Sequence, residues 1–150
     1  MKSKTMKNQT EQRGFTLIEI MVVMVILGLL VAIVAPNIMG RSDQARVTVA
    51  ETQMSNIANA LDLYRLDNSN YPSTQQGLEA LVSKPSGSPE PRNWNPEGYL
   101  NSVPEDPWGN EYQYISPGTE GPYDLFSYGA DGREGGEGDE ADISVWKVRD

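Results

Sequence analysis

The stretch FTLIEIMVVMVILGLLVAIVA, Phe15–Ala35, decides the fold of this chain. It contains 21 residues and a single charge, that of Glu19. A helix rises about 1.5 Å per residue, so this stretch is long enough to cross about 30 Å of hydrocarbon. The pattern predicts an apolar, membrane-spanning helix over residues 15–36.

Charge differs sharply on the two sides of this stretch. The 150-residue chain has a formal net charge of −9, but residues 1–14 carry four basic residues against one acid, Glu11, a local charge of +3. The remaining 136 residues therefore carry −12. The positive-inside bias predicts a cytoplasmic N-terminus and an exported C-terminal body. An acidic body would be repelled by phosphate backbones, which argues against a nucleic-acid partner.

The sequence contains no His and no Cys. This composition excludes Ser-His-Asp and Cys-His nucleophiles, Cys/His zinc sites, haem held by His or Cys, and disulfides. Metal sites built from oxygen ligands remain open.

A cleaved secretory signal is the main alternative for the N-terminal segment. A basic flank, an apolar core and small residues near Ala32–Ala35 would suit it. However, the apolar run is long for a signal core, and Glu19 interrupts it. Pro36 would also directly follow a cut at Ala35. A helix that continues past Pro36 with a bend fits these features better.

Glu19 is the most informative residue of the apolar stretch. A carboxylate near the bilayer centre costs roughly 2.5 kcal/mol or more, so it needs a partner or a shallow position. One interpretation is a plain anchor in which Glu19 snorkels or is protonated. The other is a pair with a free amine, which proteolysis between Gly14 and Phe15 would create.

The run Arg13-Gly14-Phe15-Thr16-Leu17-Ile18-Glu19, followed by apolar residues, resembles the cleavage and methylation motif of type IV pilins and type II secretion pseudopilins. The resemblance implies that a prepilin peptidase cuts after Gly14 and methylates the amine of Phe15. It also implies that Glu19 neutralises the Phe15 amine of a neighbouring subunit in a filament. A buried charge is tolerable when it finds such a partner.

Helical periodicity continues over residues 37–68. Val47, Met54 and Leu61 are seven residues apart, and three further residues fill the same stripe: Ala50, Ile57 and Tyr64. This pattern predicts an amphipathic continuation of the helix that packs one face on a globular core. Two separate helices, broken at Pro36–Gly40, are the alternative.

Residues 69–150 are expected to form the exported body. Ser73 or Thr74 can cap a short helix that extends through Ser83, with Leu78 and Leu81 facing inward. A proline-rich loop follows at 84–96. Three candidate strands complete the body: Glu111–Ser116, Asp124–Tyr128 and Ile143–Val148. We expect an α+β, pilin-like fold in which the long helix packs on a small antiparallel sheet.

Internal motifs extend the resemblance over nearly the whole chain. They are Leu66-Asp67-Asn68, Tyr71-Pro72, Gln75-Gln76-Gly77-Leu78, Asp106-Pro107-Trp108-Gly109-Asn110 and Phe126-Ser127-Tyr128-Gly129-Ala130-Asp131-Gly132. These look like the landmarks of major pseudopilins of type II secretion systems. Type IV pilins of surface fibres are the alternative, but they commonly close a C-terminal loop with a disulfide, which this chain cannot form.

The segment DGREGGEGDEAD, Asp131–Asp142, contains six acids and four glycines in twelve positions. A solvated loop is one interpretation of such a run. Calcium is the other, because Ca²⁺ takes six to eight oxygen ligands and glycines allow carbonyls to turn inward. The spacing does not fit an EF-hand, since Arg133 and Gly135 occupy positions where that motif needs oxygen side chains.

The pseudopilin resemblance implies a calcium site in this acidic loop. It assigns the side chains of Asp131 and Asp142 and the carbonyl of Tyr128 as ligands. The related pattern has paired aspartates at the far end, where this chain has Ala141-Asp142. Asp139 is the expected substitute, with Glu137 or Glu140 as alternatives.

The resemblance implies a structural subunit of a periplasmic filament, the pseudopilus, which drives export of folded proteins across the outer membrane. The implied partners are copies of the same chain, minor pseudopilins, the inner-membrane secretion platform and prepilin peptidase. A hydrolase that uses Glu105 with Asp106, or Asp139 with Glu140, is a third hypothesis. No nucleophile or orienting pair accompanies those acids in the sequence, so we expect no enzyme activity.

Overall fold

The computed structural model describes residues 14–149, apart from the side chains of residues 34–41 and 139. The chain divides into two compact units, Met1–Met39 and Gly40–Asp150. The expected leader, residues 1–14, lies outside the described residues except for Gly14. The elements in chain order are helix α1 (Leu17–Asn68), the 3₁₀ helix η1 (Leu78–Leu81), strands β1 (Gln113–Ile115) and β2 (Asp124–Ser127), the 3₁₀ helices η2 (Gly129–Asp131) and η3 (Gly138–Glu140), strand β3 (Ile143–Ser144) and helix α2 (Val145–Arg149).

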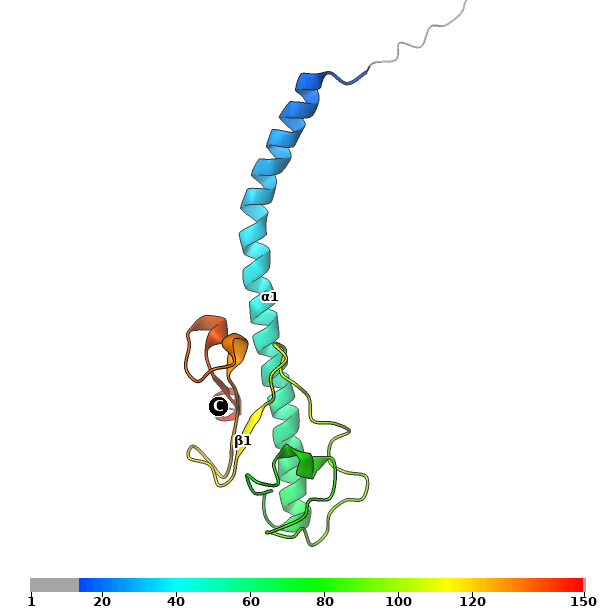
Figure 1. The fold of residues 1–150 in the computed structure, drawn as a ribbon, viewed down its shortest axis with the longest axis vertical. Coiled ribbons are helices and arrows are strands. Elements are labelled where there is room, and N and C mark those ends of the chain that lie inside the picture. Colours follow the sequence, from blue (N-terminus) through cyan, green and yellow to red (C-terminus); the bar gives the residue numbers. More distant parts are fainter. Residues whose placement is uncertain (1–13, 150) are drawn as a thin grey trace, which may run out of the picture. The chain divides into compact units, whose positions relative to one another are not determined.

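Helix α1 is a single helix of 52 residues. It continues through Pro36 and Gly40, so the two-helix alternative is wrong. Pro36 removes one backbone donor from the helix interior without ending the helix. The α1 ribbon is drawn in blue to green in Figure 1.

The first unit consists of the start of α1. All large apolar side chains described between Phe15 and Ile33 are exposed. They cover every side of the helix, because the sequence there is apolar without an amphipathic period. Of the helices in the described part of the chain, none combines the length and apolarity that crossing a membrane requires.

In the second unit, α1 buries the stripe that the sequence predicts. Met54, Ile57 and Leu61 are fully buried, and Tyr64 is 1% exposed. Ala50 begins the same stripe and is also fully buried, whereas Val47 is half-buried. Residues three and four apart lie on one helix face, so these side chains form one continuous surface for the core.

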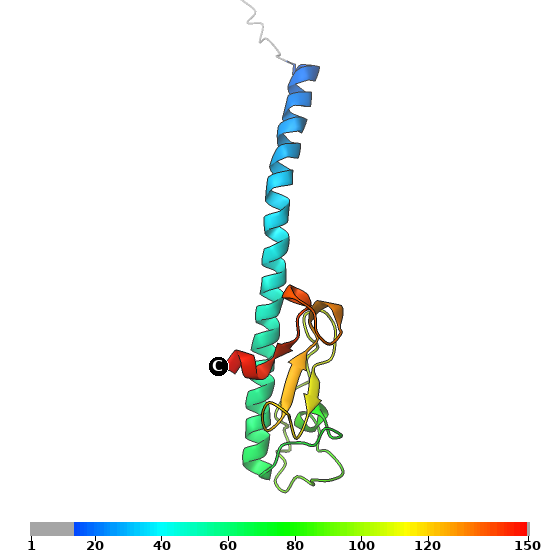
Figure 2. The ribbon, with the colours of Figure 1, turned by 90° about the vertical axis from the view of Figure 1, so that its left-hand side faces the viewer.

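The three strands form an antiparallel sheet with the order β1-β2-β3. Tyr114 pairs with Leu125, and Ser127 pairs with Ile143. Tyr114 and Leu125 are buried in the same core as the α1 stripe. Figures 1 and 2 show the sheet lying beside the C-terminal part of α1. The expected α+β fold is confirmed.

Several predicted elements differ in extent from those of the structure. The predicted strand over Ile143–Val148 ends at Ser144, and α2 begins at Val145. The helical turn lets Val145 reach the core, and it directs the indole N–H of Trp146 to the carbonyl of Tyr123 at 2.8 Å. At its end, Arg149 pairs with Asp62 of α1 at 3.2 Å.

The predicted helix through Ser83 is a turn followed by the short η1. Ser73 caps the turn as expected, because its hydroxyl accepts from the Gln76 N–H while the Gln76 side chain accepts from the Ser73 N–H. Leu78 and Leu81 are buried as predicted. The first strand, expected over Glu111–Ser116, is also shorter, and covers Gln113–Ile115.

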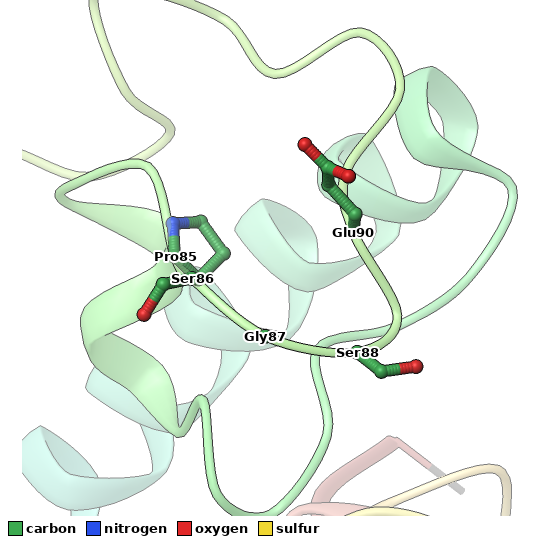
Figure 3. Close-up of a pocket in the computed structure, with 5 residues that line it drawn as sticks. All are labelled: Pro85, Ser86, Gly87, Ser88 and Glu90. Atoms are coloured by element: carbon green, nitrogen blue, oxygen red, sulfur yellow. The ribbon is translucent and has the colours of Figure 1, made fainter.

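The proline-rich loop is irregular, as predicted, and its first part is held to the body by the side chain of Gln76. The Gln76 amide donates to the carbonyls of Pro89 and Ser86, at 3.0 and 3.4 Å. Figure 3 shows the shallow pocket here, where the side chains of Ser86 and Ser88 point away from each other. Glu90 is the only charged residue that lines it.

The loop between β1 and β2 is held by a buried carboxylate, that of Asp124. It accepts from the N–H and hydroxyl of Thr119 at 2.7 and 2.8 Å, and from the Glu120 N–H at 3.0 Å. Burial alone would raise the pKa of Asp124, but these hydrogen bonds outweigh burial and the pKa lies below its ordinary value. The ionised form therefore stabilises the folded state.

Asp124→Asn is expected to lower the free energy of unfolding by about 1–3 kcal/mol at pH 7, because the charged acceptor is lost. Since the folded pKa is below the unfolded value of about 3.9, this contribution is complete above that pH. It is lost as the pH falls through the lowered folded pKa. Urea unfolding of the detergent-solubilised chain should therefore show a gap between wild type and variant that shrinks between pH 7 and pH 3.

The exposed acid Glu90 provides the control, since Glu90→Gln should change the free energy of unfolding little at either pH. An Asp124→Asn gap of equal size at pH 7 and pH 3 would contradict the role given to the ionised carboxylate.

Candidate functional site

The predicted cleavage site, between Gly14 and Phe15, lies directly before α1. Phe15 is 79% exposed, and Gly14 has open space where a side chain would project. Both residues precede the first helical residue, Leu17, so their backbone is not engaged in the helix. A protease needs an accessible backbone, free of helical hydrogen bonds, on either side of the bond it cuts.

Glu19 is positioned by a cap that the sequence reasoning missed. Its N–H donates to the carbonyl of Thr16 at 3.1 Å and to the hydroxyl of Thr16 at 3.3 Å. Thr16 is thus the N-cap of α1 and Glu19 is the third helical residue, the spacing of a capping box. The T-x-x-E pattern was the available signal. A carboxylate in the first turn is also favoured by the helix dipole.

Two short 3₁₀ helices, η2 and η3, frame the acidic loop in the orange-red part of Figure 1. Asp142 closes this loop on Gly135: its N–H donates to the Gly135 carbonyl at 3.2 Å, and its Oδ2 accepts from the Gly135 N–H at 3.1 Å. Gly136 has φ +85, and a Cβ there would lie 2.2 Å from the Glu140 carbonyl oxygen. Only glycine fits this close approach.

The expected calcium ligands lie in two groups. Tyr128 and Asp142 line one hollow beside the sheet, together with Glu134, which the sequence reasoning did not single out. Asp131 is exposed and is not among the lining residues; its Oδ1 accepts from the Arg133 N–H at 3.0 Å. The side chain of Asp139 lies outside the described residues.

The described residues supply oxygen donors but not a finished metal site. Three or more acidic side chains at metal-binding distances do not occur together among them. One atom is nevertheless poised for a ligand, because Oδ1 of Asp142 is buried and lacks a hydrogen-bond partner in the described structure. A buried carboxylate oxygen left in this state is costly unless a cation or donor approaches it. The donor chemistry therefore fits a hard cation such as Ca²⁺.

The sequence placed Asp106 in a family motif and, with Glu105, in the hydrolase hypothesis, but it did not indicate the structural role of this residue. Its side chain is 4% exposed and accepts from the N–H groups of Trp108 and Asn110 at 3.1 and 2.8 Å. It also accepts from the hydroxyl of Ser127 at 2.6 Å. The neighbouring Glu105 is exposed, so the structure does not bring the two acids together in one buried site.

Comparison with known proteins assigns the chain to a family. A family model described as "Type II secretion system (T2SS), protein G" matches residues 37–146, and one described as "Prokaryotic N-terminal methylation motif" matches residues 10–35. Type II secretion system core protein G of Pseudomonas aeruginosa is 65% identical over 136 residues, which cover 91% of this chain and 96% of the relative. The corresponding protein of Vibrio cholerae is 55% identical, with coverage of 97% and 99%.

A solved structure agrees with these matches. The crystal structure of the major pseudopilin from the type 2 secretion system of enterohaemorrhagic Escherichia coli superposes with a TM-score of 0.67 at 46% sequence identity. The match covers 75% of this chain and 96% of that one. The fold, the methylation motif and the matched relatives agree, and the chain belongs to the protein G family of type II secretion systems.

Proposed function

We propose that this chain is a structural subunit that is processed at its N-terminus and polymerises into the periplasmic pseudopilus of a type II secretion system. One observation carries the proposal: Phe15 and the first turns of α1, through Ile33, expose apolar side chains on every side, within the segment that the N-terminal methylation motif matches. Such a surface must be covered in the cell, since exposed apolar area of this extent favours burial. Lipid covers it before assembly, and the same segments of neighbouring subunits cover it afterwards.

The proposed subunit is anchored in the inner membrane with its N-terminus in the cytoplasm and its body in the periplasm. The basic leader and the acidic body support this orientation. Its partners are further copies of the chain, minor pseudopilins, the secretion platform of the inner membrane and prepilin peptidase. Its role is structural rather than catalytic, and the membership in the protein G family supports this.

We further propose that calcium binds the acidic loop. Support comes from the buried Oδ1 of Asp142 and from the hollow that Tyr128, Glu134 and Asp142 line. Asp131 is the last residue of η2, three residues after Tyr128 in the chain. The charge of the ion offsets the repulsion among the six acids of the loop, and binding orders the loop around it.

Gly14→Leu is expected to block processing, because a peptidase must bring the scissile backbone close and a branched side chain would obstruct it. Uncleaved precursor should accumulate in the membrane fraction when the variant is expressed with prepilin peptidase. Gly28→Leu is a matched control: Gly28 also has open space around it, but it lies inside α1 and away from the cleaved bond. Normal mature protein from Gly14→Leu would overturn the assignment of the cleavage site.

Glu19→Gln is expected to leave processing and the Thr16 cap intact, since the capping donor is the backbone N–H of residue 19. Assembly should fail, because the amine of Phe15 on the neighbouring subunit loses its counter-charge, at a cost of about 3 kcal/mol or more in apolar surroundings. Crosslinking of membrane fractions measures the ladder of oligomers. Asp43→Asn, the nearest other acid of α1, should give the normal ladder. Wild-type oligomers from Glu19→Gln would refute the pairing.

Calcium is expected to raise the thermal midpoint of the full-length chain in detergent micelles over that in chelator. A ligand at a hundredfold excess over its Kd stabilises the folded state by about 2.7 kcal/mol. Asp142→Ala should abolish the difference between the two conditions, whereas Glu97→Ala, which removes an exposed acid outside the loop, should preserve it. Equal wild-type midpoints with calcium and with chelator would show a loop that is merely solvated.

A further inference from the structure

A turn outside the acidic loop supports the point where that loop begins. The turn comprises residues 106–110, and the buried carboxylate of Asp106 organises it. Oδ1 accepts from the N–H groups of Trp108 and Asn110, while Oδ2 accepts from the hydroxyl of Ser127. Three donors on one buried carboxylate hold it in a single orientation.

The hydrogen bonds continue from this carboxylate to Gly129. The hydroxyl of Ser127 accepts from the Gly129 N–H at 3.1 Å, and the side-chain amide of Asn110 donates to the Gly129 carbonyl at 3.4 Å. Both backbone polar groups of Gly129 are therefore held by the same turn, one directly and one through Ser127. Ser127 is fully buried, so water does not compete for these bonds.

Because peptide groups are planar, the hydrogen bond to the Gly129 N–H also affects the carbonyl of Tyr128. The N–H of Gly129 and the carbonyl of Tyr128 belong to one planar peptide group and point in opposite directions. When Ser127 fixes the N–H, it also fixes the direction of the Tyr128 carbonyl oxygen. The φ of +69 at Gly129 allows the chain to turn sharply into η2 immediately afterwards.

We infer that Asp106 and Ser127 are positioning residues for calcium, which orient the Tyr128 carbonyl before the ion binds. This inference rests on the calcium site proposed above. The opposite end of the loop is held differently, because Asp142 bonds only within the loop, to Gly135, and its Oδ1 is buried without a partner in the described structure. The end of the loop at Tyr128 is therefore arranged before calcium binds, and only the end at Asp142 has to be ordered by the ion. This arrangement lowers the conformational cost of binding.

The test is a titration of the calcium-free, full-length chain in detergent with calcium chloride, followed by calorimetry. Ser127→Ala should raise the Kd roughly tenfold or more, the range found when supporting residues around metal ligands are removed. This substitution removes no charge, so a weaker affinity cannot come from lost attraction to the ion. Asp106→Asn should weaken binding in the same direction.

Asn68→Ala is the matched control for lost stability. Asn68 is 3% exposed and bonds the Tyr64 carbonyl, the Tyr99 hydroxyl and the Asn93 N–H, all outside the acidic loop and its supporting turn. Its loss should lower the thermal midpoint and leave the calcium Kd unchanged. Hydrogen exchange supplies a second readout: the Gly129 amide should be protected in calcium-free wild type and unprotected in Ser127→Ala.

The outcomes separate the two proposals. If wild type binds calcium and Ser127→Ala binds it equally well, the positioning role is overturned and the calcium site stands. If wild type binds no calcium, the site fails and the positioning role fails with it. Should Ser127→Ala not fold, Asp106→Asn disturbs the same chain of hydrogen bonds to the Gly129 N–H, and a several-fold rise in Kd supports the inference while an unchanged Kd overturns it.

Discussion

The burial of one helix face governs the body of this protein. Within residues 40–150, α1 presents Ala50, Met54, Ile57, Leu61 and Tyr64 to the core, and the short strands have no other apolar surface of that length to pack against. An isolated three-stranded sheet with strands of two to four residues would be marginal in water. The strands are therefore stable because the helix is there. Losing that face would leave loops without a core.

In the loops of this body, buried polar side chains accept the backbone hydrogen bonds that helices and sheets satisfy in larger domains. Loops make up most of the body, and their backbone N–H groups need acceptors when they are buried. Asp124 supplies them for the loop between β1 and β2, Asp106 for the 106–110 turn, and Asn68 for the proline-rich loop at Asn93. Each of these side chains is less than a tenth exposed. Asp106 also holds the start of the acidic loop, through Ser127 and Gly129.

The long helix and its buried stripe could be predicted because apolar periodicity is a local signal. The α+β class and the approximate places of β1 and β2 followed from short alternating segments and turn residues. The end of β3 could not be read in this way, since Val145, Trp146 and Val148 suit a strand by composition. Tertiary contacts decided it: the Trp146 indole bonds the Tyr123 carbonyl and Arg149 pairs with Asp62, 87 residues away in sequence.

The candidate sites also differ in whether a local sequence signal or a tertiary contact determines them. Gly14, Phe15 and Glu19 lie in one short motif, and their placement at the start of α1 follows directly from it. The acidic loop was recognisable by composition, but the grouping of Tyr128 with Glu134 and Asp142, apart from Asp131, depends on how the loop folds back on Gly135. The role of Asp106 could not be predicted from the sequence, because its partner Ser127 is 21 residues away.

The proposed role of the chain depends on what happens to its N-terminus, because a processed apolar helix is an assembly segment and an unprocessed one is only an anchor. Mass spectrometry of the wild-type chain recovered from membranes measures this directly. We expect a chain that begins at Phe15, lacks residues 1–14 and carries one additional methyl group. An intact chain beginning at Met1, or one cut after Ala35 in the manner of a secretory signal, would contradict it.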